Sequence, residues 1–286
     1  MENALFITTS NNLRYMTRKY SRLYFGNEFC EKLIPQPDEL KRVVAYCDKN
    51  KTAFSLVTPY VTNSGLEKLE RLFLWLSSNR ADSEVIINDY GVLDLIDEKY
   101  HSLLPVLGRL LTKQKRDPRI SRLIRKKLKK YIFPQKDNRY AIIFEKRIPD
   151  TLISYFKETN ASVPIIQDFL RKFRINRVEI DNLLQGINLR IPKDSFCASL
   201  YVPYGYITTT RLCSANPFNR LKKFSCRISN CRKECKTYTI ELRNKYFPLL
   251  HKRGNTTFFK NNATPARKEL IEKGINRIVY QPQIPI

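Results

Sequence analysis

The feature that most constrains the fold of this chain is a regular alternation of short apolar runs with longer amphipathic segments. Runs of strand type begin at Ala4, Arg22, Ala53 and Glu84. Between them lie segments such as residues 38–50, whose apolar side chains recur every three or four positions. This spacing is typical of helices that pack one face on a core. The alternation predicts parallel strands joined by helical crossovers.

Further strand-type runs lie at residues 103–111, 177–180, 199–208 and 277–281. They bring the expected total to about seven or eight strands, which suits a barrel. We therefore predict an α/β fold in which one (β/α) barrel-like domain spans residues 1–286 and carries a cysteine-bearing segment near its C-terminal end. An open doubly wound sheet is the alternative. The chain has no glycine-rich loop of the dinucleotide- or nucleotide-binding type, which argues against those functions.

One predicted helix has a clear start signal. Ser64 and Glu67 fit the capping box, in which each side chain accepts a hydrogen bond from a backbone amide of the first turn. We therefore expect this helix to begin at Ser64, after a buried strand over residues 53–61.

The charge balance points to an anionic partner. The chain has 52 Lys and Arg residues against 27 Asp and Glu residues, a net charge of +25. Nucleic acid, an acidic protein, an anionic membrane or an anionic metabolite would each offset such an excess. The most basic stretch, residues 113–130, favours RNA through phosphate neutralisation. Tyr131 and Phe133 come only at its end, so base stacking is not indicated within it, and a solvated helix face is the alternative.

The N-terminal residues lack the basic and apolar regions of a secretory signal. No run approaches the roughly 20 apolar residues that a membrane-spanning helix needs. We therefore expect a cytoplasmic protein without a transmembrane segment, whose seven cysteines stay reduced. Clustered cysteines in that compartment favour metal binding or reactivity over disulfides.

Four of the cysteines lie within 23 residues: Cys213, Cys226, Cys231 and Cys235. Thiolates are strong ligands for iron and zinc, and one loop can present two of them to the same centre. The spacing matches neither a zinc ribbon nor a ferredoxin, so it does not choose the metal. The alternative is that these are small buried or incidental thiols, which is how we interpret Cys47 and Cys197.

Polar residues follow two of the predicted strands. Asn88 and Asp89 end one strand, and Arg109 and Lys113 follow another. In a barrel, such positions face the active side, and Arg109 is suited to bind a carboxylate with two parallel hydrogen bonds. We predict these four residues as substrate-binding. A structural ion pair or a helix cap is the alternative for Asp89 and Arg109.

Several stretches together resemble peptidase family U thirty-two, the collagenase-like proteins that include UbiU and UbiV. They occur in order over nearly the whole chain: YFGNEFC at 24–30, VTPYVT at 57–62, VIINDYG at 85–91, LGRLL at 107–111, KRDPR at 115–119, TTTRLC at 208–213, CRKEC at 231–235, GNT at 254–256 and IVYQP at 278–282.

The resemblance implies a cofactor and its ligands. UbiV-like members hold a [4Fe–4S] cluster on one early and three late cysteines. Matched motif by motif, the ligands are Cys30, Cys213, Cys231 and Cys235, and Cys226 is a reserve ligand. Zinc is the alternative metal.

The resemblance also implies a function and partners. Family members take part in oxygen-independent hydroxylation of a ubiquinone precursor or of a base in RNA, with prephenate as the suggested oxygen source, and UbiU and UbiV work as a pair. The expected partners are therefore RNA or an anionic metabolite such as prephenate, and a second family member as heterodimer partner. The alternatives are a basic RNA-binding module with a structural metal site and a protease. Peptidase activity has little support, because His101 and His251 are the only histidines and neither lies in a catalytic motif.

Overall fold

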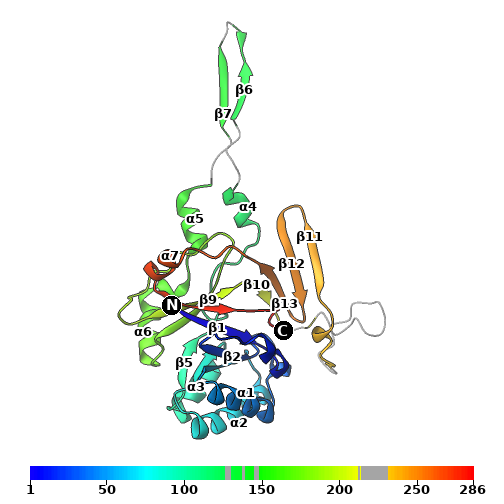
Figure 1. The fold of residues 1–286 in the computed structure, drawn as a ribbon. Coiled ribbons are helices and arrows are strands. Elements are labelled where there is room, and N and C mark those ends of the chain that lie inside the picture. The colour runs from blue at the N-terminus through cyan, green and yellow to red at the C-terminus, as the bar shows by residue number, and fades with distance from the viewer. Residues whose placement is uncertain (126–129, 137–138, 145–147, 212, 214–230) are drawn as a thin grey trace.

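The computed structural model describes residues 1–125, 130–136, 139–144, 148–211, 213 and 231–286. Eight parallel strands close into a barrel in the order β1-β14-β9-β8-β5-β4-β3-β2 (Figure 1). The predicted α/β barrel is therefore confirmed, and the open sheet is excluded because β1 pairs with both β2 and β14.

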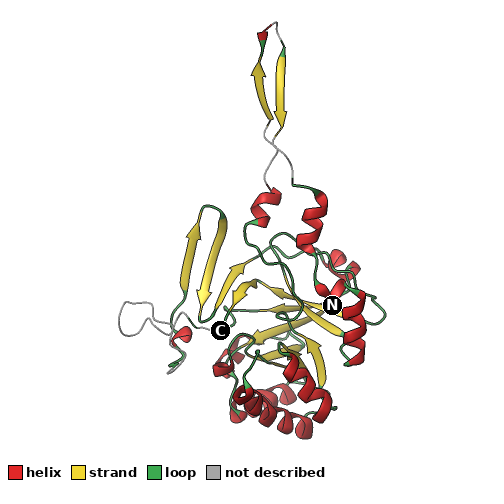
Figure 2. Ribbon diagram, turned by 180° about the vertical axis from the view of Figure 1, so that it is seen from behind, coloured by secondary structure: helices red, strands yellow, loops and turns green. Residues whose placement is uncertain are grey.

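The elements of the barrel follow the predicted alternation. Its strands are β1 (Glu2–Ile7), β2 (Arg22–Gly26), β3 (Ala53–Val57), β4 (Glu84–Ile87), β5 (Leu104–Leu107), β8 (Arg177–Asp181), β9 (Cys197–Val202) and β14 (Ile275–Tyr280). The helices are α1 (Pro37–Lys49), α2 (Asn63–Asn79), α3 (Tyr90–Lys99), α4 (Ile120–Arg125), α5 (Asp150–Lys157), α6 (Pro164–Lys172) and α7 (Arg267–Glu272). Helices α1, α2 and α3 lie together against one side of the barrel (Figure 2).

Alternate strand residues enter two different cores. In β1 and β2, Leu5 and Leu23 belong to the large cluster that packs on the helices. Phe6 and Tyr24 belong to a smaller cluster with Val57 on the other face of the strands. This two-residue period explains why the strands read as nearly continuous apolar runs, since both of their faces are buried.

The predicted capping box at Ser64 is wrong. Helix α2 begins at Asn63 with Thr62 as the residue before its first turn, and that residue makes no side-chain cap. Instead, the backbone amide and the hydroxyl of Thr62 both donate to Glu31 Oε2 at 2.8 Å. A carboxylate from a distant loop thus takes the place of the local cap.

The predicted strand over residues 199–208 is two strands. Strand β9 ends at Val202, Pro203 interrupts the pattern, and β10 (Tyr204–Thr209) leaves the barrel. Strand β10 heads an antiparallel sheet with β13 (Thr256–Lys260), β12 (Phe247–Arg253) and β11 (Ile240–Asn244). A separate two-stranded hairpin is formed by β6 (Lys130–Pro134) and β7 (Tyr140–Phe144). Across the described ranges, no helix is both long and apolar enough to cross a membrane.

The barrel interior holds a buried carboxyl group that is only half satisfied. Tyr24 Oη donates to Glu179 Oε1 at 3.0 Å, whereas Glu179 Oε2 has no hydrogen-bond partner among the described residues. Burial is the largest influence on this group and raises the pKa of Glu179 to about 7, although Arg277 and Arg177 oppose the shift. The folded protein therefore favours the protonated acid.

This burial predicts a pH-dependent stability. Because the folded state holds the proton of Glu179 more tightly than the unfolded state, the free energy of unfolding should fall as the pH rises from about 4.5 to about 7. The slope from one group is at most about 1.4 kcal/mol per pH unit. Urea unfolding at several pH values tests this, and Glu179→Gln should flatten the profile over that window. An unchanged profile in the variant would assign the pH dependence to other groups.

Candidate metal centre and adjoining pocket

The first predicted metal ligand lies in the loop that follows β2. Gly26 ends this strand with a φ of 135°, and a Cβ atom there would lie 2.1 Å from the carbonyl oxygen of Val57. Only glycine fits this close approach. The next residue, Asn27, accepts hydrogen bonds on Oδ1 from the amides of Phe29 and Cys30, at 3.0 and 2.9 Å. The turn therefore sets the position of Cys30.

The late cysteines come from two segments. Cys213 follows the end of β10, and Cys231 and Cys235 flank a tight turn that leads into a short 3-10 helix, Glu234–Lys236. Lys233 adopts a left-handed conformation with a φ of 62°, and its amide donates to Cys231 Sγ at 3.4 Å. Arg253 Nε donates to the carbonyl of Cys235 at 2.8 Å. The β12–β13 turn thus supports the segment that carries both thiols.

One amide side chain links the early loop to the late segments. Asn255 Nδ2 lies 2.6 Å from the carbonyl of Phe29, 2.7 Å from the carbonyl of Thr210 and 2.9 Å from Tyr60 Oη. Its two protons are therefore shared among three acceptors. Asn255 is buried, so it joins the residue before Cys30 to the strand end before Cys213.

The four predicted ligands lie close enough to influence one another. Burial, with smaller contributions from Cys213, Cys30 and Cys231, raises the pKa of the Cys235 thiol to about 12. Burial also raises the pKa of Cys30, with contributions from Cys231 and Cys213. Like charges that approach one another disfavour ionisation. The structure therefore brings together side chains that are more than 200 positions apart in the sequence.

The cysteines do not form a complete metal site in the described part of the chain. All four cysteines are free thiols. No group of three or more His, Cys, Asp or Glu side chains, within the part of the chain that is described, is placed so that it could hold a metal ion. The reserve ligand Cys226 lies outside the described residues. Cys47 is buried on α1, and Cys197 lies at the first residue of β9, toward the opposite end of the barrel.

The donor set nevertheless suits a thiophilic metal centre. The four thiols lie at the C-terminal side of the barrel, and charge on the other thiols raises the pKa of Cys30 and of Cys235. A bound cation reverses this repulsion and favours the ionised thiols. Four thiolates are the usual ligands of [4Fe–4S] clusters and of structural zinc sites. The chemistry of the four side chains therefore suits either group, whereas their placement among the described residues is not that of a formed metal site.

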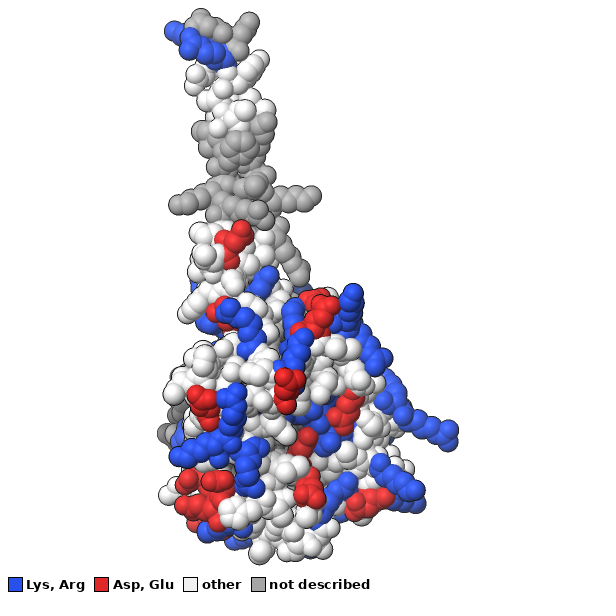
Figure 3. Space-filling view, turned by 90° about the vertical axis from the view of Figure 1, so that its left-hand side faces the viewer, with Lys and Arg blue, Asp and Glu red and all other residues white. Residues whose placement is uncertain are grey.

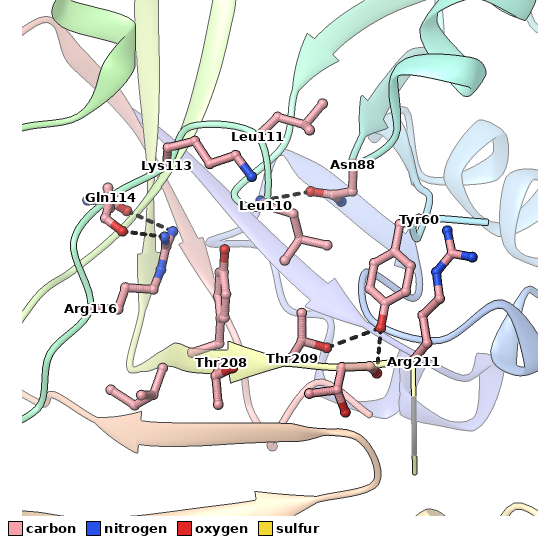
Figure 4. Close-up of a pocket in the computed structure, with 13 residues that line it drawn as sticks. Tyr60, Asn88, Leu110, Leu111, Lys113, Gln114, Arg116, Thr208, Thr209 and Arg211 are labelled. Carbon is pink, nitrogen blue, oxygen red and sulfur yellow. Dashed lines mark hydrogen bonds between the residues drawn. The ribbon is translucent and has the colours of Figure 1, made fainter. Parts of the chain in front are cut away.

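A pocket of about 540 Å³ adjoins this region (Figure 4). Its lining comes from the loops after β3, β4 and β5 and from β10 and the residues that follow it. The lining residues are Tyr60, Asn88, Leu110, Leu111, Lys113, Gln114, Arg116, Tyr206, Ile207, Thr208, Thr209, Thr210 and Arg211.

Three of the lining residues are cations and none is acidic. Lys113 is exposed, has a φ of 44°, and extends over the pocket from one side, whereas Arg211 approaches from the other (Figure 4). Arg116 is held in place, because its Nε donates to Asp181 Oδ2 at 2.8 Å. Asp181 offsets the charge of Arg116, whereas no acidic residue of the described lining offsets Lys113 or Arg211. This excess of positive charge favours an anionic ligand.

The residues predicted to bind substrate have different surroundings in the structure. Lys113 and Asn88 line the pocket. Asn88 is buried and structural in its contacts, since Nδ2 donates to the carbonyl of Thr58 at 2.8 Å and Oδ1 accepts from the amide of Leu110 at 3.1 Å. Asp89 caps α3 by accepting from the amide of Gly91 at 2.8 Å. This is the alternative that was left open for Asp89, and its substrate-binding role stays a prediction.

Arg109 lies beneath the pocket in an ion-pair network. Its guanidinium is fully buried and donates to Glu28, to Asp181 Oδ1 at 2.6 Å and to the carbonyl of Tyr204 at 3.1 Å. It also lies 3.9 Å from the ring centre of Tyr201. Burial disfavours its charge, but Glu28 and Asp181 outweigh this and raise the pKa of Arg109. These contacts favour the structural ion pair over the binding of a substrate carboxylate.

Some important residues were not singled out from the sequence. Tyr60 and Asn255 fall within stretches that carry the family resemblance, yet nothing in their spacing indicates that they meet. Glu28 and Asp181 each follow or end a strand, so a barrel prediction places them at the same face. Which of these carboxylates pairs with Arg109 depends on contacts between distant loops, and single-sequence patterns do not contain that information.

Comparisons with known proteins are sparse. No family model and no curated protein matches the sequence. One solved structure that aligns with the chain is entitled "The Structure of the U32 Peptidase Mk0906". The alignment covers 100% of this chain and 94% of that one, with 9% sequence identity and a TM-score of 0.44. A likeness at this level concerns the course of the chain alone.

Proposed function

We propose that this chain is an iron–sulfur protein that holds a [4Fe–4S] cluster on Cys30, Cys213, Cys231 and Cys235. The observation that carries the proposal is that the segments bearing these thiols meet. Asn255 joins the residue before Cys30 to Thr210, shortly before Cys213, and Cys213 packs against the apolar cluster that contains Cys235. Zinc on the same thiols is the competing outcome. Cytoplasmic location remains a prediction that is consistent with reduced thiols.

The second part of the proposal is that the pocket binds an anionic substrate beside this centre. Tyr60 belongs to both places: it lines the pocket, and it packs against the apolar cluster that includes Cys235 and Cys213. Tyr60 Oη donates to the carbonyl of Thr210 at 2.7 Å. A substrate held by Lys113 and Arg211 would therefore lie next to the cysteines.

The reaction proposed for this site is oxygen-independent hydroxylation of RNA or of a quinone precursor. When bound, an iron–sulfur cluster supplies one-electron chemistry whose potential depends on local charge and burial. The residues of this chain bind and orient the substrate: Lys113 and Arg211 attract its negative charge, and the hydroxyls of Thr208 and Thr209 offer hydrogen bonds. Prephenate is a dicarboxylate and is a suitable anionic ligand for the same cations.

The features of the pocket do not favour proteolysis. Its described lining contains no His, Asp, Glu, Ser or Cys, so the Ser–His and Cys–His pairs common in proteases are absent from those residues. His251 lies on β12, and His101 lies in the turn before β5 at the far end of the barrel.

Purification without oxygen tests the cofactor. We expect brown protein with visible absorbance and about four iron and four sulfide ions per chain. Cys30→Ala and Cys235→Ala should lose most of the iron because each removes a ligand. Cys197→Ala is the matched control and should retain it, since this thiol lies at the other end of the barrel. Colourless protein with stoichiometric zinc would contradict the iron–sulfur proposal.

The reaction requires a separate test. Deletion of the gene should remove one hydroxylated nucleoside or quinone, as measured by mass spectrometry of total RNA nucleosides and lipids. The wild-type gene should restore that product, and the gene carrying Cys235→Ala should not. If every such product survives the deletion, the hydroxylation proposal fails while the cluster proposal stands.

A further inference from the structure

The β6–β7 hairpin, residues 130–136 and 139–144, projects away from the barrel as an arm (Figures 1 and 3). Its strands pair antiparallel, and the amide of Gln135 donates to the carbonyl of Arg139 at 2.8 Å next to the turn. In the sheet pairing, β6 and β7 pair with each other and with no other described strand. A two-stranded ribbon of this kind is marginally stable in water unless something packs against it.

The arm exposes large apolar side chains along its length. They are between 45% and 65% exposed, and they are Tyr131, Ile132, Phe133, Tyr140 and Ile142. Exposed apolar residues that occur singly need no explanation, but a contiguous group on a projecting element marks a binding surface.

The strand register sorts these residues by face. Tyr131 and Phe133 are two positions apart on one strand, so their rings lie on the same face of the ribbon. Ile132 pairs directly with Ile142, and this pair lies on the other face. Tyr140 pairs with Pro134 and so shares the face of this pair. One face therefore carries the two neighbouring rings of Tyr131 and Phe133, and the opposite face carries the Ile132–Ile142 pair with Tyr140.

The positive charge of the arm favours an anionic partner over a second copy of this chain. Lys136 and Arg139 are exposed next to the turn, and Figure 3 shows Lys and Arg side chains at the tip. Asp137 is the one acidic residue in the hairpin sequence, and it lies outside the described residues. With a net charge of +25 on each chain, a second copy would be repelled.

We propose that the face of the β6–β7 arm that carries Tyr131 and Phe133 binds single-stranded RNA. Tyr131 and Phe133 stack on unpaired bases, and Lys136 and Arg139 neutralise phosphates near the tip, which is the usual combination in single-strand recognition. This proposal deepens the proposed function, because it selects RNA over a quinone precursor as the substrate. The basic stretch before the arm leads toward the barrel and its pocket.

Fluorescence anisotropy with a fluorescein-labelled single-stranded RNA of about 16 nucleotides tests the proposal on the full-length protein. The double variant Tyr131→Ala, Phe133→Ala should bind about ten-fold or more weakly, because two stacking contacts are lost. The matched variant Ile132→Ala, Ile142→Ala should bind as the wild type does, as should Leu74→Ala on α2. Lys136→Gln should reduce the slope of log affinity against log salt by about 0.7, the value for one phosphate contact.

Two results would overturn this proposal. If the Tyr131→Ala, Phe133→Ala variant binds RNA like the wild type, the arm is not the RNA site. In that case, a protein that co-purifies with the wild type but not with an Ile132→Ser, Ile142→Ser variant would be the partner of the arm. If duplex RNA competes as well as the single strand, stacking on unpaired bases is excluded. The Cys235→Ala protein, which lacks a predicted cluster ligand, should keep its RNA affinity, so failure of the cluster proposal and failure of the arm proposal are distinguishable.

Discussion

Replacement of Arg109 by methionine is expected to lower the free energy of unfolding by about 3–5 kcal/mol, because it leaves buried carboxylates without their partner. Glu28 and Asp181 are both fully buried and both accept hydrogen bonds from this guanidinium. Arg116 still pairs with Asp181 in the variant, whereas Glu28 loses its ion-pair partner. Denaturant unfolding measures the effect.

The matched control is Arg119→Ala. Arg119 also pairs with a carboxylate, Asp117, but its side chain is mostly exposed. Surface pairs of this kind contribute little because water and salt screen them, so we expect no measurable change. Equal losses in the two variants would mean that burial does not set the strength of the Arg109 network. A loss of substrate affinity without a loss of stability would support the predicted substrate-binding role of Arg109.

The second large effect is expected for Gly26→Ala. A methyl group there meets the backbone carbonyl of Val57 at 2.1 Å, and the φ of 135° is unfavourable for any residue with a Cβ. We expect a loss of about 3 kcal/mol in the free energy of unfolding. Because Gly26 begins the loop that carries Cys30, the iron content after anaerobic purification should fall as well.

Gly91→Ala is the control for this backbone effect. Gly91 lies in the first turn of α3, and an added Cβ would meet only Asp89 Oδ1, at 3.3 Å. Alanine favours helix over glycine by about 1 kcal/mol, so stability should be maintained or slightly increased. If Gly26→Ala is as stable as Gly91→Ala, the β2–β3 contact is looser than the structure indicates.

The barrel was predictable because its signals are local. Helix α1 and strand β8 lie within one residue of their expected bounds, since a short apolar run and a three-to-four-residue spacing are properties of adjacent residues. The residues that hold the ends of the elements were less predictable. Helix α2 takes its N-terminal partner from Glu31, and no pattern around Ser64 contains that residue.

The antiparallel sheet and the arm were missed for a different reason. Strands such as β11 and β7 follow no helical spacer, so they lack the alternation that identified the barrel strands. In β10, the polar run Thr208–Thr210 looked like the end of a strand that belonged to the barrel. Pro203 was the signal for two elements, because proline cannot donate to a sheet and rarely lies inside a central strand.

In the candidate site, too, local signals were predictable from the sequence and contacts between distant segments were not. The residue types of the late cysteines indicated a metal from the sequence, whereas Cys30 was joined to them only by family resemblance. Lys113 was predicted from its position after β5 and does line the pocket. Arg211 was not predicted as a pocket residue, because its place opposite Lys113 depends on how β10 leaves the barrel.

Closure of the barrel sets the order in which this protein can mature. The last strand, β14, pairs with the first, β1, through contacts such as Ala4 with Val279, and the C-terminal Ile286 packs in the same apolar cluster as Cys235. A chain in which residues 275–286 have not yet been synthesised therefore lacks part of the framework around the thiols. Under the proposal of a metal centre at these thiols, a chain shortened before β14 should fail to hold the metal, although it retains all four cysteines.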